Sequence, residues 1–342
     1  MTIHEIAKEA KVSIATVSRA INRVRSVDPV LARRVWKVVE KVGYYPNTHA
    51  RALVSGRSRI FALIVSEITN PFFPEIVQRM MELGLEHNYE ILLNACGQDP
   101  HLLETAARQI IQRRVDGVAI LTLGTEDTLV KIFTRQQVPV FVVDMASSEP
   151  LVKSVHIDYE HGIRQAVQHL AALGHVSIAF ISGPTHLKSA AIQKAAFARC
   201  MSEIGLEVPA ERLVDGDHTM TCGMKALAFW VALPARPSAV LCSSDMSAIG
   251  VMRQAFELGL NVPADLSVVG FDDIRLAQFM IPPLTTVQMS QTEIADTAFS
   301  ALLDSAEPWR NPQRRRKYGI KTNLVLRRST ALAPCRVREL QP

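Results

Sequence analysis

The chain has 342 residues, of which 48% are hydrophobic and 21% charged, and its formal net charge is +5. This length and composition indicate a folded soluble protein of two or three domains. The longest apolar runs, such as Ile60–Val65, have about six residues against the roughly 20 that a spanning helix needs, which excludes a membrane protein. The N-terminal sequence lacks a basic segment followed by an apolar stretch, so we expect no secretory signal and a cytoplasmic location.

The charge is distributed unevenly along the chain. The first 59 residues hold 12 Lys and Arg against 4 Asp and Glu, whereas the remaining 283 hold 26 against 29. A basic N-terminal part on a slightly acidic body favours a polyanionic partner for that part alone. Solvated surface charge is the alternative explanation when the charge is considered without a motif.

The basic part begins with apolar residues at helical spacing over residues 2–22, interrupted once at Lys11-Val12-Ser13. This pattern predicts two short helices joined by a tight turn. Thr2 and Glu5 have the spacing of a capping box on the first helix, and Ser13 is placed to cap the second. A third helix is predicted over residues 28–42.

A helix-turn-helix places the early residues of its second helix against base edges in the DNA major groove. Arg19 is the only long bidentate donor there, and its natural target is guanine O6 and N7. Ile14 and Ala15 suit apolar contacts such as thymine methyls, while four polar residues suit phosphate oxygens or base edges: Ser13, Thr16, Ser18 and Asn22. Further arginines add phosphate charge or are simply exposed charges: Arg23, Arg25, Arg33 and Arg34.

From Ile60 onward, short β-rich apolar runs alternate with helical patterns, which predicts an α/β body with two parallel sheets built from right-handed crossovers. The predicted strands cover residues 60–65, 91–94, 118–121, 140–143, 155–157, 178–181, 239–242 and 266–270. The predicted helices cover residues 75–87, 102–113, 161–173, 190–204, 247–258 and 293–304. Ligands of such sheets bind outside the carboxyl ends of the strands.

Several long, ordered motifs carry a resemblance to a known family. They are Thr2-Ile3-His4-Glu5-Ile6-Ala7, Val12-Ser13-Ile14-Ala15-Thr16-Val17-Ser18-Arg19-Ala20-Ile21-Asn22, Gly43-Tyr44-Tyr45-Pro46-Asn47, Asn70-Pro71-Phe72-Phe73, Ser243-Ser244-Asp245 and Val268-Val269-Gly270-Phe271-Asp272-Asp273. With them the chain resembles the lactose-repressor/galactose-repressor (LacI/GalR) family over nearly its whole length. One departure is Lys11, where the family usually has glycine; a left-handed conformation there costs a non-glycine residue on the order of 1 kcal/mol.

The resemblance implies three parts: a helix-turn-helix DNA-binding domain (1–45), a hinge helix and linker (46–59), and a two-lobed, periplasmic-binding-protein-like body (60–342). Lobe 1 is expected at about 60–160 and 292–322, and lobe 2 at about 161–291 and 323–332. The hinge becomes helical on the operator in this family, where a leucine enters the minor groove; the matching residue is Leu53, with Ala50 beside it and Asn47 at the start. Leu53 as an ordinary core leucine is the alternative.

The resemblance also implies an effector in the cleft between the lobes. The matching positions are Phe72, Phe73, His161, Leu187, Ser189, Gln193, His218, Ser244 and Asp272. Sugar-binding relatives usually have arginine at Gln193, asparagine at Ser244 and an aromatic residue at His218, so we expect a ligand other than a simple sugar. Core packing for the two phenylalanines, ordinary histidines, and a capping or turn role for Asp272 are the alternatives.

These features predict a sequence-specific transcriptional regulator, a repressor, that binds double-stranded operator DNA as a homodimer and responds to a small-molecule effector. No cofactor, metal or membrane is expected, and no sequence motif of catalysis is present, so we expect no enzyme. The alternative is a DNA-binding regulator whose body has lost effector binding and serves only dimerisation. A sugar-transport protein would share the body but lack the basic head. The run Arg314–Lys317 is expected to be a solvated loop.

Overall fold

The computed structural model describes residues 2–21, 27–43, 57–97, 99–122, 124, 126–145, 147, 149–307 and 318–334. The chain forms two compact units, Met1–Ser58 and Arg59–Pro342. Of the predicted hinge helix and linker (46–59), residues 46–56 lie outside the described part, so its limits stay a prediction.

The first unit contains three short helices: α1 (Ile3–Ala10), α2 (Ile14–Ile21) and α3 (Pro29–Val42). Thr2 and Glu5 form the predicted capping box on α1. Asp28 caps α3 by accepting hydrogen bonds from the N–H groups of the first turn. The helices enclose a small apolar core made of Ile6, Ala7, Ala10, Val17, Ala20, Val35 and Val39.

The second unit contains two six-stranded sheets, one in each lobe. In lobe 1 the order is β11-β5-β4-β3-β1-β2, and every neighbouring pair is parallel. Its strands are β1 (Ile60–Val65), β2 (Glu90–Ala95), β3 (Gly117–Leu121), β4 (Val140–Val143), β5 (Val152–Asp158) and β11 (Tyr318–Lys321). The inner strands β1 and β3 are buried almost throughout, as a parallel sheet covered on both faces requires.

In lobe 2 the order is β12-β10-β9-β8-β6-β7. Its strands are β6 (Ile178–Ile181), β7 (Leu213–Val214), β8 (Ala239–Cys242), β9 (Ser267–Asp272), β10 (Thr285–Gln288) and β12 (Asn323–Val325). The pair β10 and β12 is antiparallel, whereas the other pairs are parallel. The predicted parallel sheets are therefore present, with one antiparallel strand at the edge of the second sheet.

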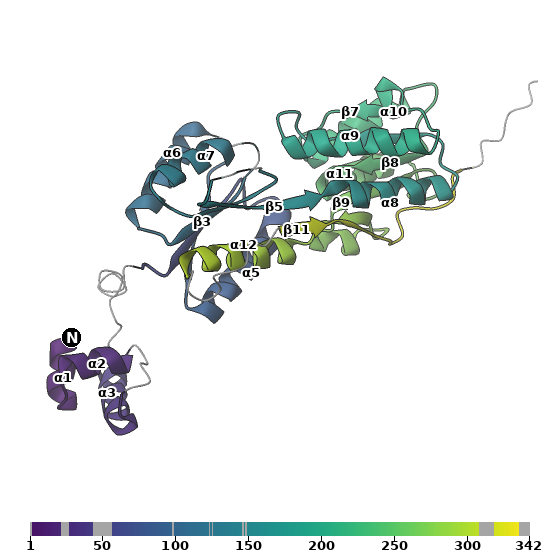
Figure 1. Ribbon diagram of the computed structural model, residues 1–342. Helices are drawn as coiled ribbons and strands as arrows, with labels where there is room; N and C mark the ends of the chain where they lie inside the picture. Colours follow the sequence, from purple (N-terminus) through teal and green to yellow (C-terminus); the bar gives the residue numbers. More distant parts are fainter. Residues whose placement is uncertain are drawn as a thin grey trace, which may run out of the picture. The chain divides into compact units, whose positions relative to one another are not determined.

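Helices cover both faces of each sheet. In lobe 1, α5 (Phe72–His87) and α12 (Gln291–Ala306) lie together on one face and α6 (Pro100–Gln112) and α7 (Glu126–Arg135) on the other (Figure 1). In lobe 2, α8 (Tyr159–Ala172) packs on α9 (Lys188–Glu203), and α10 (Met220–Val231) packs on α11 (Asp245–Glu257). Two short 3-10 helices, η1 (Ala210–Arg212) and η2 (Arg275–Phe279), complete the unit.

The chain passes between the lobes three times, between β5 and α8, between β10 and α12, and between β11 and β12. This is the arrangement that the family resemblance implies. The last passage takes a single residue, Thr322, which is fully buried and whose Oγ1 donates to the carbonyl of Asp158 at 2.7 Å. The hydroxyl thereby joins the first and third passages.

Most predicted helices of the body begin two or three residues earlier in the structure than in the sequence-based expectation. The cause is capping: the side chains of Asp99, Asp158, Ser244 and Ser290 accept hydrogen bonds from the first turns of α6, α8, α11 and α12. Apolar spacing marks only the part of a helix that faces the core. Elements absent from the expectation are α7, α10, β7, β10, β11 and β12.

Candidate functional site

The helix α2 presents a mainly exposed surface of the kind expected for a DNA-reading helix. Ser13, Ile14, Ala15 and Arg19 are exposed, with Ile14 at 42%, while Thr16 and Ser18 are partly buried. Ile14 is exposed whereas Val17, three residues later, is fully buried, so Ile14 is placed for an apolar contact with a partner.

Capping takes up part of the polar set on this helix. The Oγ of Ser13 accepts from the backbone N–H of Thr16 at 3.1 Å, and the two hydroxyl oxygens lie 2.8 Å apart. The predicted cap is therefore present. The hydroxyl groups of Ser13 and Thr16 are thus engaged with each other. Within the described residues, the side chain of Arg19 makes no comparable hydrogen bond.

The turn between α1 and α2 contains the one non-glycine residue with a positive φ among the described residues of the head. Lys11 adopts a left-handed conformation, with φ 51° and ψ 49°, as the departure from glycine suggested. Arg34, from α3, donates through Nη2 to the carbonyl of Ala10 at 2.6 Å and lies 3.5 Å from that of Lys11. Arg34 thus braces the turn, a structural role that differs from the phosphate contact expected for it.

Four residues of the predicted DNA interface, Asn22, Asn47, Ala50 and Leu53, lie outside the described residues. The same holds for Arg23, Arg25 and the run 314–317. Their roles stay predictions.

A cavity of about 260 Å³ lies between the two sheets of the body, beyond the carboxyl ends of β1, β3, β4, β8 and β9. This is the position at which open α/β sheets bind ligands. Eight of the nine residues predicted for the effector line it: Phe72, Phe73, Leu187, Ser189, Gln193, His218, Ser244 and Asp272. The structure therefore brings together side chains from five separate segments of the sequence.

The structure does not bring His161 to the cavity. Its backbone N–H donates to the Asp158 carboxylate at 3.1 Å, within the first turn of α8, and its ring lies 3.3 Å from the amide of Gln165. Tyr159, two residues earlier, lines the cavity instead. Since α8 begins at Tyr159, the tyrosine is the residue that enters from this element.

Asp144 and Tyr159 form a hydrogen-bonded pair that the sequence did not reveal. The Tyr159 hydroxyl donates to Oδ2 of Asp144 at 2.7 Å, and the N–H of Ile157 donates to Oδ1 at 2.8 Å. Burial raises the pKa of both groups. The pair thereby joins the end of β4 in lobe 1 to the first residue of α8 in lobe 2. The available signal was position: both residues follow a predicted strand.

Asp272 lies at the end of β9 with φ 111°, a conformation that non-glycine residues rarely adopt. Its backbone carbonyl accepts from Nε2 of Gln291 at 2.8 Å, at the start of α12. Burial, and then the negative charge of nearby Asp245, raise the pKa of its carboxyl. Strained backbone persists where the surroundings fix it, and such positions concentrate at functional sites.

Asp245 is a second buried acid near Asp272. It is fully buried, accepts from Thr286 Oγ1 at 2.5 Å and from the N–H of Ile274 at 2.8 Å, and burial raises its pKa to about 7. Ser244, just before it, caps α11 by accepting from the N–H of Ser247 at 3.2 Å.

His218 is a neutral group on the wall of the cavity. Burial lowers its pKa to about 4, and its Nδ1 lies 3.5 Å from Oγ of Ser243. The ring packs on Gly183, where an added Cβ would approach it to 2.4 Å. A neutral imidazole offers one donor and one acceptor and no charge.

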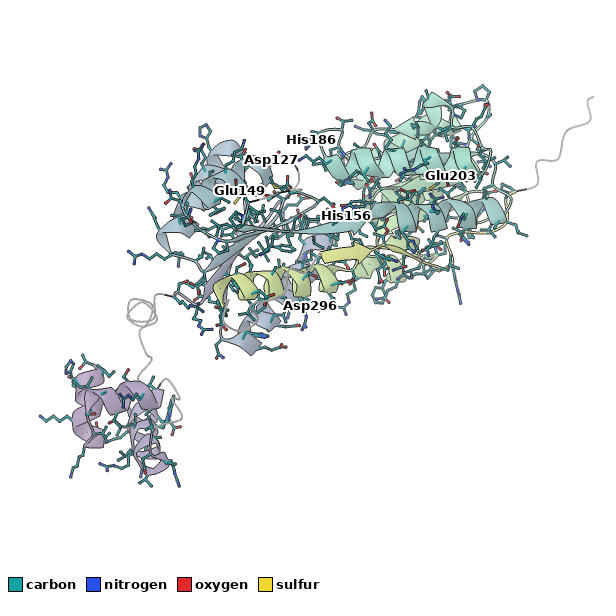
Figure 2. All side chains as sticks on the ribbon, viewed as in Figure 1. Asp127, Glu149, His156, His186, Glu203 and Asp296 are labelled. Carbon is teal, nitrogen blue, oxygen red and sulfur yellow. The ribbon has the colours of Figure 1, made fainter. Side chains whose placement is uncertain are left out.

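The two lobes touch at the rim of the cavity. Lys188 Nζ of lobe 2 lies 3.7 Å from Oδ2 of Asp127 of lobe 1, and the ring of His186 lies close against Gly124. Asp127 and His186 mark the two sides of this rim in Figure 2. The cavity is therefore enclosed on this side by contacts that must separate for the lobes to open.

At the other end of α12, a second ion pair fixes the start of the body. Arg59 Nη1 lies 2.8 Å from Oε1 of Glu307, whose side chain is 3% exposed, and the guanidinium lies 5.0 Å from the centre of the Tyr89 ring. Glu307 directly follows the last residue of α12.

Within the described ranges, no three His, Cys, Asp or Glu side chains gather as a metal site. None of the helices in this part of the chain combines the length and apolar character needed to cross a membrane.

Each of the two units matches a known protein family model. Residues 2–47 match the model "Bacterial regulatory proteins, lacI family", and residues 167–330 match a periplasmic binding protein-like domain. The chain is 33% identical over 306 residues to the HTH-type transcriptional repressor CytR of Escherichia coli K12, covering 90% of each chain. It is 32% identical over 303 residues to catabolite control protein A of Priestia megaterium, covering 88% of this chain and 91% of the relative.

Among solved structures, the lac repressor dimer bound to operator and the anti-inducer ONPF superposes with a TM-score of 0.84 at 26% identity, over 97% of this chain and 99% of that one. The complex of the transcriptional regulator CelR with cellobiose superposes with a TM-score of 0.71 at 28% identity, over 96% of this chain and 99% of that one.

Proposed function

Because the chain belongs to the lacI family of bacterial regulatory proteins, we propose that it is a transcriptional repressor that binds a pseudo-palindromic operator as a dimer and responds to a small-molecule effector. One observation carries the proposal: a head with an exposed reading helix and a body with an enclosed cavity at the strand ends occur in one chain. The head supplies DNA affinity, and the cavity supplies the control.

On DNA, Arg19 contacts a guanine edge in each half-site, and Ile14 and Ala15 contact thymine methyl groups or other apolar base surfaces. Leu53, flanked by Asn47 and Ala50, enters the minor groove between the half-sites and makes affinity depend on how easily the central step deforms. The exposed positions of Arg19 and Ile14 support the first contact set.

Two half-sites require two heads, and the body offers surfaces for pairing. In lobe 1, α5 exposes Met81 and Leu85, the latter at 82%. In lobe 2, the segment around η2 exposes Leu276, Phe279 and Ile281, the last at 94%. Large apolar side chains this exposed are typical of interaction sites, and we infer that a second copy covers them.

The effector acts through the difference between its affinities for two arrangements of the lobes. A ligand that bridges Asp144 of lobe 1 and Asp272 of lobe 2 favours the closed arrangement, in which the rim contact between Asp127 and Lys188 is made. The chain acts in this scheme by binding alone, without a catalytic step.

One observation favours the alternative, a body that only dimerises. The Ser244 hydroxyl is buried and used within α11, so it offers little to a ligand. A cavity without bound effector in any tested condition, and operator affinity that no metabolite changes, are the results that this alternative predicts.

The experiment is operator selection from genomic fragments, followed by affinity measurement at fixed salt. Arg19→Ala should lose about 1–3 kcal/mol of discrimination between the selected operator and a variant with the contacted guanine replaced. Arg33→Ala, a matched charge loss on α3, should weaken binding to both sequences alike. Equal discrimination by the wild type and Arg19→Ala contradicts the proposed reading helix.

A further inference from the structure

Carboxyl groups gather in the deep part of the cavity. Asp144 and Asp272 line it from lobe 1 and lobe 2, and Glu126 and Asp127 line it nearer the rim. Glu126 is occupied locally, since its Oε1 accepts from Thr122 Oγ1 and from the N–H of Gly124, each at 3.1 Å. The two inner carboxyl groups come from sequence positions far apart, so the fold assembles them at one place.

Positively charged side chains do not balance these carboxyl groups inside the cavity. Lys188 is the only lysine or arginine among the described residues that line the cavity, its side chain is 69% exposed, and its Nζ lies 3.7 Å from Asp127. His218 is neutral because burial lowers its pKa. Arg327 has Asp273 as its partner, at 2.6 Å. The positive groups are thus at the rim or already paired.

The two inner carboxyl groups differ in how far the protein satisfies them. Asp144 receives hydrogen bonds from Tyr159 and Ile157, and His156 Nδ1 lies 3.3 Å away. The Asp272 carboxyl has only the backbone N–H of Asp245 and, beyond it, another buried acid. Asp272 is therefore the carboxyl without a compensating charge in the described part of the chain.

An amide side chain is available to an occupant of this space. Gln193 lines the cavity and is 4% exposed, and no side-chain hydrogen bond holds it within the described residues. Its amide therefore offers both a donor and an acceptor to a ligand. The remaining wall is apolar and aromatic, formed by Phe72, Phe73, Met145, Met289 and Ile294.

We propose that the effector of this cavity is a small organic amine, whose ammonium group binds Asp272 and whose carbon skeleton packs on the aromatic and aliphatic wall. This deepens the proposed function and rests on it for the regulatory role. Burial favours the protonated form of the Asp272 carboxyl, because it raises the pKa of this group. An anion would raise that pKa further, and a neutral hydroxyl would leave the carboxyl without a charge partner. An ammonium group stabilises the ionised carboxylate beside it, and the nearby phenylalanine rings also attract cations.

The test compares amines with alcohols and carboxylates of the same skeleton on the purified full-length protein. Three sets span the shapes that the cavity holds: phenethylamine, phenethyl alcohol and phenylacetate; glucosamine, glucose and gluconate; cadaverine, pentanediol and glutarate. We expect at least one amine to raise the melting temperature in proportion to its occupancy. Its alcohol should bind about tenfold more weakly, and its carboxylate should give no shift.

Two cavity variants and one control sharpen the result. Asp272→Asn should abolish the response to the amine, and Gln193→Arg, which places a cation in the cavity, should abolish it too. Glu104→Gln removes the same charge from the exposed surface of α6 and should leave the response unchanged. The second cavity variant keeps the test decisive if Asp272→Asn folds poorly.

The proposal is overturned if no amine shifts the melting temperature, if an alcohol or carboxylate shifts it as much, or if the shift persists in both cavity variants. Operator binding by the same preparations separates the two proposals. A protein that binds its operator but no amine refutes the ligand class alone. A protein that binds an amine but no operator refutes the regulatory function.

Discussion

Arg34 Nη2 and the carbonyl oxygen of Ala10 are 2.6 Å apart, so a side chain of the third helix holds the end of the first. The contact falls at the turn that orients α2, and it is partly buried. The orientation of α2 thus depends on a side chain of α3.

We expect Arg34→Ala to destabilise the head by about 1–3 kcal/mol, because a charged donor to a partly buried carbonyl is lost. Hydrogen exchange of the α1 and α2 amides in the full-length protein measures this directly. Arg33→Ala, whose Nε makes only a 3.4 Å contact with Pro29, is the matched control and should change exchange little. Similar hydrogen-exchange rates in Arg34→Ala and Arg33→Ala would contradict the proposed role of Arg34 in holding the turn.

Lys11→Gly should act in the opposite direction. Lys11 is left-handed, at φ 51°, and glycine adopts this conformation without the side-chain clash, so the head should gain about 0.5–1 kcal/mol. The same exchange measurement reports it as slower opening of α1 and α2. Lys8→Gly, within the regular part of α1, should instead lower stability by a comparable amount.

The stability of the body should fall in mild acid because of His218. Its pKa is about 4 in the folded state and about 6.5 when unfolded, so the unfolded chain binds the extra proton between these values. The free energy of unfolding therefore decreases as pH falls from about 6.5 to about 4, by about 3 kcal/mol from this group.

Urea denaturation of the wild type and His218→Gln at pH 7 and near pH 4.5 isolates this contribution. The difference between the two proteins should shift in favour of the variant at the lower pH. Other groups titrate in both proteins and cancel in the comparison. A difference that stays constant with pH would show that His218 is not held neutral.

Arg59→Ala should destabilise the body by about 1–3 kcal/mol, because the buried carboxylate of Glu307 loses its cationic partner. The double variant Arg59→Met, Glu307→Leu removes both charges and should recover most of that loss. Thermal unfolding of the wild type, Arg59→Met, Glu307→Leu and the double variant measures the coupling between the two side chains. Purely additive effects would contradict a direct interaction between the two side chains.

The sequence predicted the elements whose apolar residues recur at a clear spacing. It did not predict the elements whose position depends on packing against the rest of the fold. The helix α10 is mostly apolar around its whole circumference, Met-Thr-Cys-Gly-Met-Lys-Ala-Leu-Ala-Phe-Trp-Val, so a helical spacing is hard to recognise in it. Strands β7 and β12 have two and three residues, too few for any pattern. Their positions follow from the sheet edges that they complete.

The candidate cavity shows the same division. Asp272 and Gln193 were identified by matching family positions, and both line the cavity. Asp144 was missed because nothing in its neighbourhood reveals that Tyr159, 15 residues later, will donate to it. His161 came from the same matching of family positions, but it lies in the first turn of α8, and Tyr159 lines the cavity in its place.

The helix α12 joins two places that have so far been described separately. Its first residue, Gln291, is hydrogen-bonded to the backbone of Asp272, and the residue after its last, Glu307, pairs with Arg59, where the body begins. Its 16 residues form a rod about 24 Å long. Because a helix resists compression along its axis, we expect a displacement of Asp272 along α12 to be transmitted to Glu307 and so to Arg59.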